Sequence, residues 1–120
     1  MGKEDKKSKQ PPISDLMKKL LEPQDVVISR YRTSDGTPKI DDFKEAVSRG
    51  FFLIKFPKIF GGTEIGVNLK NLPKDFGVEY SPDNTTIKVS GKVEFQNIPT
   101  RFKASFRLDS FEGTGCLELL

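Results

Sequence analysis

Histidine is absent from this chain of 120 residues, and cysteine occurs only once, as Cys116. Without histidine, the chain lacks the usual general base of serine and cysteine nucleophiles and the commonest metal ligand. A single cysteine can neither close a disulfide within the chain nor build a structural zinc site, and it fits a reducing compartment. Because no basic residue neighbours it in sequence, Cys116 is interpreted as a small packing residue rather than a redox centre.

Carboxylates are the remaining groups that could support acid–base chemistry. Asp41, Asp42 and Glu45 lie close together in an expected helix. Acidic residues in a first turn complement the helix dipole and face water, so we interpret these three as solvated. We therefore expect no enzyme, and no bound metal or cofactor.

Tryptophan and long hydrophobic runs are missing as well. No apolar run approaches the roughly 18 residues of a membrane-spanning helix, and the N-terminus has no apolar signal-peptide core. These absences predict a cytoplasmic protein without a transmembrane segment. The apolar residues that are present include ten phenylalanines but only two tyrosines. Since phenylalanine carries no polar group, this composition predicts a dry core.

The net charge is only +3. Residues 1–24 hold six lysines and four acidic residues, so the rest of the chain is close to neutral. A near-neutral body gives no general electrostatic reason to bind a polyanion, and any such function must use a local patch. Residues 1–10 are charged and have no hydrophobic periodicity, which predicts a disordered tail.

Two short amphipathic helices are expected within a single domain that spans residues 11–120. The first, over residues 11–23, is bounded by prolines and has apolar residues at helical spacing. Its apolar stripe consists of Ile13, Leu16, Met17, Leu20 and Leu21. The second helix, over residues 38–50, turns Ile40, Phe43 and Val47 to one side. Helices this short are marginal alone, so both stripes are expected to dock on a sheet or on a partner.

Residues 51–120 predict an antiparallel sheet. From Thr86 to Asp109, apolar and polar residues alternate in two successive runs, which is typical of a hairpin with one dry and one wet face. A turn centred on Ile98 and Pro99 predicts a register in which Glu94 lies opposite Lys103. Residues 51–58 are apolar on both faces and predict a strand that is covered on both sides. The expected fold class is α+β, a twisted and mainly antiparallel sheet of about six to seven strands with two short helices on its apolar face.

The outward positions of the predicted hairpin form the best candidate binding surface. We name this surface the basic face, and it consists of Lys88, Lys92, Arg101, Lys103 and Arg107. Single-strand nucleic-acid binders combine such a face with exposed aromatic residues, and none is expected here at outward positions. The apolar stripe of the first helix is a second candidate, in which Leu16, Met17 and Leu20 would contact a partner.

These features predict a small non-catalytic accessory or protein-binding subunit that acts through the basic face and the amphipathic N-terminal segment. Its partner is expected to be another protein. One alternative is a nucleic-acid-binding protein that uses the same face electrostatically, and this alternative is not favoured. A second alternative is a carrier that holds an apolar small molecule in a phenylalanine-rich interior. The sequence indicates no oligomeric state.

Overall fold

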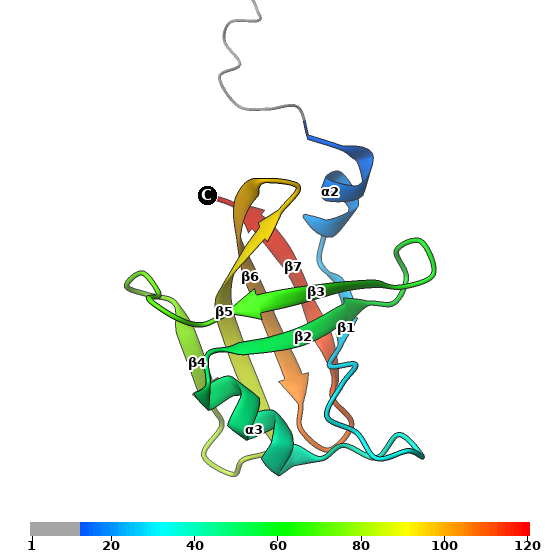
Figure 1. The fold of residues 1–120 in the computed structure, drawn as a ribbon, viewed down its shortest axis with the longest axis vertical. Coiled ribbons are helices and arrows are strands. Elements are labelled where there is room, and N and C mark those ends of the chain that lie inside the picture. Colours follow the sequence, from blue (N-terminus) through cyan, green and yellow to red (C-terminus); the bar gives the residue numbers. More distant parts are fainter. Residues whose placement is uncertain (1–12) are drawn as a thin grey trace, which may run out of the picture.

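The computed structural model describes residues 13–120, and its fold is shown in Figure 1. The predicted tail over residues 1–10, and residues 11 and 12 of the first predicted helix, lie outside the described residues. The elements are, in order, α2 Asp15–Leu20, β1 Gln24–Val27, α3 Ile40–Ser48, β2 Phe51–Phe56, β3 Thr63–Asn68, β4 Gly77–Tyr80, β5 Thr86–Phe95, β6 Ile98–Arg107 and β7 Glu112–Leu119. No helix within residues 13–120 is both long and apolar enough to cross a membrane.

Six strands form a closed antiparallel barrel in the order β3-β2-β1-β7-β6-β5, and β4 is an extra strand on the outer side of β5. The barrel closes where β3 returns to β5, through the pair Asn68 and Lys92. The prediction of an α+β open sheet is therefore wrong, because the protein is mostly β and its sheet closes. Alternation identifies which residues face inward, but it does not determine whether the two ends of a sheet meet.

Gly91 marks the place where the barrel closes. A Cβ atom at this position would lie 2.5 Å from Val67 Cγ1 and 3.1 Å from Leu69 Cδ2, so the missing side chain lets β3 cross closely over β5. In the sequence, Gly91 is a gap in an otherwise apolar face. A glycine in a strand interior often marks such a close approach of another backbone.

The β5–β6 hairpin differs from the predicted register. Its turn is formed by Gln96 and Asn97, whose φ angles of 53° and 65° are those of a two-residue type I′ turn. Glu94 therefore lies opposite Pro99, and not opposite Lys103 as predicted. The prediction placed the turn at the proline, whereas Pro99 lies in β6 just beyond the β6–β7 ladder, which ends at Thr100. Because the shift is by an even number of residues, the inward and outward faces are the predicted ones.

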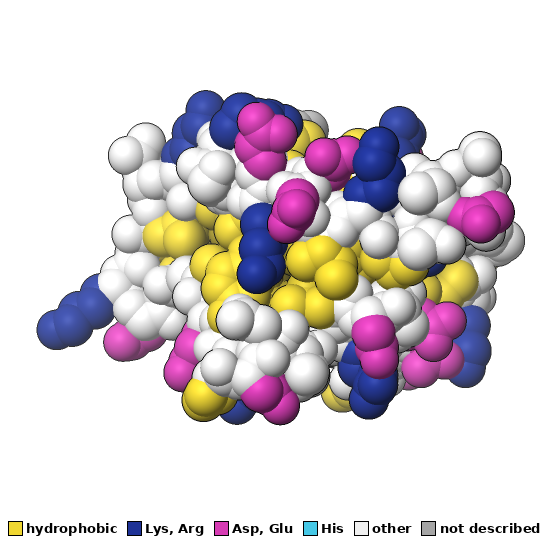
Figure 2. Space-filling model, turned by 90° about the horizontal axis from the view of Figure 1, so that it is seen from below, with side chains coloured by type: hydrophobic (Ala, Val, Ile, Leu, Met, Phe, Trp, Pro, Cys, Tyr) yellow, Lys and Arg dark blue, Asp and Glu magenta, His cyan; other side chains and the backbone are white. Residues whose placement is uncertain are grey.

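Phenylalanine rings fill the interior of the barrel. Six are essentially fully buried, namely Phe43, Phe52, Phe56, Phe102, Phe106 and Phe111. The ring of Phe43 on α3 lies 5.3 Å from those of both Phe52 and Phe111, measured between centroids. Helix α3, which is shorter than the predicted 38–50, therefore closes one end of the barrel. Figure 2 views the molecule from this lower end, where hydrophobic side chains gather in a band across the middle of the face.

Helix α2 is also shorter than the predicted 11–23, and its apolar stripe packs on the chain's own core. Met17 and Leu20 are fully buried, and Leu16 is half-buried against the same core. Ser14 caps the helix by accepting a hydrogen bond from the amide of Met17, at 3.0 Å. The Ser14 hydroxyl donates to Oε1 of Gln96 at 2.6 Å, which joins the start of α2 to the tip of the β5–β6 hairpin.

The outer face of β2 is less covered than expected. Phe51 is 50% exposed, and its ring lies over Gly66 of β3. The strand has alternating burial, so only one of its faces belongs to the core. The run of apolar residues over 51–58 predicted cover on both sides, and this was wrong because the barrel has only one interior.

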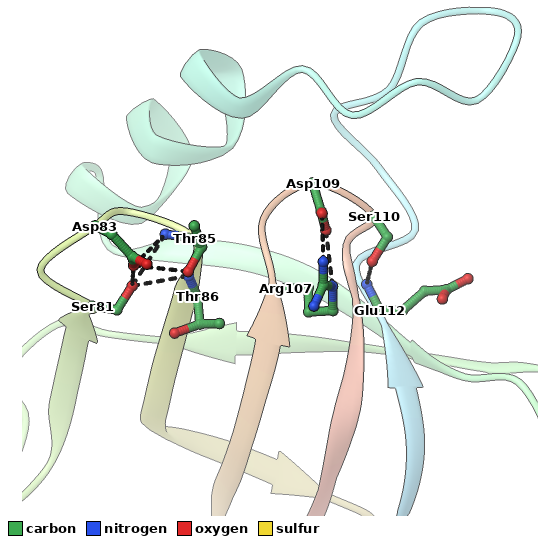
Figure 3. A network of polar contacts seen from close by, with 8 residues as sticks. All are labelled: Ser81, Asp83, Thr85, Thr86, Arg107, Asp109, Ser110 and Glu112. Carbon is green, nitrogen blue, oxygen red and sulfur yellow. Dashed lines mark hydrogen bonds and ion pairs between the residues drawn. The ribbon is translucent and has the colours of Figure 1, made fainter.

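Two loops at the lower end of the barrel share one polar arrangement, and Figure 3 shows the first of them. In the β4–β5 loop, the Asp83 carboxylate accepts hydrogen bonds from the hydroxyls of Ser81 and Thr85, at 2.7 and 2.8 Å. Asp35 accepts in the same way from Thr33 and Thr37 in the loop that precedes α3. These hydrogen bonds hold the pKa of both carboxyls below its usual range. Each loop therefore has a hydrogen-bond network of its own, centred on one carboxylate.

Glu64 on β3 forms an ion pair with Arg30 on the barrel wall. Arg30 donates to it from Nε at 2.9 Å and from Nη2 at 3.0 Å, and Ser29 donates at 2.8 Å. Mainly through these hydrogen bonds, the pKa of Glu64 falls from 4.5 to about 2. A lowered folded-state pKa stabilises the fold above the ordinary glutamate pKa, and the contribution is lost as the pH falls through the folded value.

We expect a double-mutant cycle with Arg30→Ala and Glu64→Gln to give a coupling of about 0.2–1 kcal/mol at neutral pH, since both side chains are partly exposed. The coupling should decrease between pH 4.5 and about 2, and also in high salt. Urea denaturation at each pH measures it. A coupling of the same size below pH 2 would show that the carboxylate charge does not contribute.

Candidate functional site

An open groove crosses the outer face of the barrel over β4, β5, β6 and β7. Its volume is about 520 Å³. Its lining is formed by strand residues and by the segment that leads into β4, and includes Asp75, Phe76, Glu79, Lys88, Ser90, Lys103, Ser105 and Thr114. The groove therefore lies on the predicted basic face, although only two of the five basic residues line it.

The strand registers place small polar side chains between the two lysines of the groove. Lys88 lies opposite Ser105 of β6, while Lys103 lies opposite Ser90 of β5. The two lysines are therefore at diagonal positions, and the hydroxyls of Ser90 and Ser105 lie between them. Thr114 of β7, opposite Ser105, extends this row of small residues. Short side chains on the middle strands explain why the outer face is hollowed here.

Arg101 is held at the upper end of the groove by three contacts. Its Nε donates to the Ser90 hydroxyl at 2.5 Å, and its Nη2 donates to the Asp75 carbonyl oxygen at 3.1 Å. Its guanidinium carbon lies 4.5 Å from the centroid of the Phe76 ring, within the range of a cation–π contact. All three of these partners are neutral groups, and the nearest carboxylate in the strand register is Glu118, opposite Arg101 on β7.

The other basic residues of this face have mixed surroundings. Arg107 forms two hydrogen bonds with Asp109, at 3.0 and 2.6 Å, which are drawn in Figure 3. Lys103 approaches Glu118 at 3.8 Å, and Lys92 donates to the Asn71 carbonyl oxygen at 3.3 Å. Within residues 13–120, Lys88 forms no ion pair, although Glu79 lies opposite it on β4. The structure brings all five basic residues to one outer face and also places four carboxylates there, Glu79, Glu94, Asp109 and Glu118.

Cys116 lies beside the groove on β7, directly opposite Lys103. The side chain is partly buried, and this burial, together with the nearby Glu118 carboxylate, raises the pKa of the thiol. A raised pKa keeps the sulfur protonated and unreactive at neutral pH.

Phe76 and Glu79 were not identified as site residues from the sequence. The predicted basic face was confined to the β5–β6 hairpin, on which no aromatic side chain points outward. A signal was present, because Ser81, Pro82, Asp83 and Asn84 are typical turn residues and favour pairing of the segment before them with β5. In the structure, this pairing places Glu79 opposite Lys88, and the ring of Phe76 contacts Arg101.

The remaining candidates do not form a site within the described part of the chain. Met17 and Leu20 are in the core, so they could contact a partner only if α2 detached. On α3, Asp42 pairs with Lys39 and Glu45 pairs with Arg49, each at 3.1 Å, and these exposed carboxylates do not converge. Residues 13–120 hold no group of three or more side chains placed to bind a metal ion.

Comparison with known proteins gives no relative: no family model matches the chain, and no curated protein matches it. Inference about function therefore depends on the groove and on the charges around it.

Proposed function

We propose that the protein is a non-catalytic accessory module that binds another protein through the groove and the basic face around it. The observation that carries the proposal is the mixed charge of this surface. Five lysine and arginine side chains share this surface with four carboxylates, and the hydroxyl groups of Ser90 and Ser105 lie between the two groove lysines. Folded proteins present surfaces of mixed charge and hydrogen-bonding groups, whereas a polyanion is bound best by a surface of one sign.

The groove, rather than the N-terminal helix, is assigned as the contact surface. Lys88, Lys103 and Thr114 are exposed, and they can bind without any change in the fold. Contact through Met17 and Leu20 would first require two fully buried side chains to leave the core. Binding at the groove avoids this cost.

Tagged protein purified from its native host should retain a partner in a fixed ratio. The double variant Lys88→Ala/Lys103→Ala should lose that partner, because it removes both lysines of the groove. The matched control is Lys18→Ala/Lys19→Ala, which removes the same charge from the exposed side of α2. If both double variants retained the partner equally, the groove would not be the contact surface.

Binding of single-stranded nucleic acid is the second candidate, and Phe76 is the observation that favours it. This half-buried ring lines the groove next to the fixed guanidinium of Arg101. An aromatic ring beside positive charge is the usual arrangement for stacking a base. This function predicts that an oligonucleotide binds with a steep salt dependence, and that Phe76→Ala weakens the binding. Affinity that is independent of salt would exclude it.

A further inference from the structure

The extra strand β4 has one edge that no strand of residues 13–120 covers. The six barrel strands each pair on both sides, whereas β4 pairs only with β5. In Figure 1, β4 lies at the side of the barrel and no strand lies beyond it. An uncovered edge of this kind is the usual place where an extended segment adds to a sheet.

The direction of the backbone groups on β4 follows from its register. The amide of Ser81 donates to the carbonyl oxygen of Thr86 at 3.0 Å, so this pair is hydrogen-bonded. Bonded and non-bonded pairs alternate in an antiparallel ladder, so Glu79 and Gly77 are bonded to β5. The amide and carbonyl groups of Val78 and Tyr80 therefore point away from β5. Within residues 13–120, no other segment forms hydrogen bonds with them.

The side chains of β4 indicate which residues an added strand would carry. Val78 and Tyr80 face inward and pack against the core, while Glu79 faces outward and is exposed. Directly opposite residues of neighbouring strands lie on the same face of a sheet, so a residue opposite Glu79 would contact its carboxylate. A basic side chain is favoured there, and apolar side chains are favoured on either side of it.

We propose that β4 accepts an extended segment of another protein, in which apolar and basic residues alternate, as an eighth strand. Backbone hydrogen bonds to Val78 and Tyr80 would hold the segment, and Glu79 would select its charge. This inference goes beyond the proposed groove function, because the segment would be held by backbone groups at the free edge of β4, although Glu79 also lines the groove. A four-residue strand offers only two residues for pairing, so the interaction is expected to be reversible.

Amide hydrogen exchange tests the proposal with a capped peptide that alternates valine and lysine. In the free protein, the amides of Val78 and Tyr80 should exchange faster than that of Glu79. An excess of the peptide should slow both by about tenfold or more. A control peptide that alternates valine and glutamate should slow them much less, because Glu79 repels it.

Two variants complete the test. The variant Val78→Pro removes an amide that points away from β5 and leaves the hydrogen bonds between β4 and β5 in place. Because this amide would bind the added strand, the peptide should no longer slow amide exchange in the variant. Should that variant fail to fold, Glu79→Lys is a surface change that should reverse the preference between the two peptides.

Protection by neither peptide would overturn the proposal. Concentration-dependent protection without any peptide would also overturn it, because the occupant would then be a second copy of this chain. Retention of the partner by Lys88→Ala/Lys103→Ala, with peptide protection intact, would contradict only the groove function.

Discussion

Replacing Leu20 with aspartate is expected to remove most of the stability of the protein. Leu20 is fully buried where α2 packs on the barrel. Truncation of a buried leucine costs about 2–5 kcal/mol, and a carboxylate at the same position must also be moved out of water or protonated. Domains of this kind are stable by about 5–15 kcal/mol, so the variant should lose its cooperative transition or unfold at much lower urea concentration. Urea denaturation followed by circular dichroism measures the change.

Lys19→Asp is the matched control for this substitution. Lys19 is the neighbouring residue, it is exposed, and the change introduces the same carboxylate in the same helix. Its free energy of unfolding should fall by no more than about 1 kcal/mol, the usual upper cost of an exposed acidic residue in the last turn of a helix. If Leu20→Asp were equally harmless, α2 would not be part of the core, and its stripe would be available to a partner.

The substitution Gly113→Ala is expected to have the second large effect. A Cβ atom at Gly113 would lie 1.8 Å from the carbonyl oxygen of Ser105 and 2.8 Å from the Cα atom of Phe106. Both are backbone atoms of β6, so no side chain can move aside and the two strands must separate. Overpacking of this kind costs about 1–3 kcal/mol and occasionally more. Thermal denaturation should show a clearly lower midpoint.

Thr114→Ala provides the comparison for Gly113→Ala. Thr114 is the next residue of β7, it is exposed, and its side chain lies on the outer face. Loss of its β-branched side chain should cost at most about 1 kcal/mol. Equal midpoints for the two variants would mean that β6 and β7 are not packed as closely as the structure shows.

The direction of side chains could be predicted from the sequence because it depends on local periodicity. Ile87, Val89 and Val93 face the interior as their alternation indicates, and Lys88 faces outward. The same is true of the stripe of α2, where spacing identified the buried side chains Met17 and Leu20.

Barrel closure and hairpin register could not be predicted in the same way. Closure depends on the contact of β3 with β5 at Gly91, between segments far apart in the sequence. The register depends on whether Gln96 and Asn97 adopt positive φ angles, and the neighbouring Pro99 was a stronger but misleading turn signal. The basic face could be located from the sequence. Its charge balance could not, because Glu79 and Glu118 reach it from two other strands.

The closure of the barrel also has a kinetic consequence. Strands β5 and β6 are paired along their whole length, whereas two other seams have one residue pair each: β3–β5 at Asn68 and Lys92, and β1–β2 at Val27 and Lys55. Partial unfolding begins where the fewest hydrogen bonds must break, so the barrel should open first at one of these two seams. Opening between β3 and β5 would leave a continuous seven-stranded sheet with a newly accessible phenylalanine-rich face. Transient exposure of such a face is a common route to aggregation, so these two seams determine how well the protein tolerates heat and high concentration.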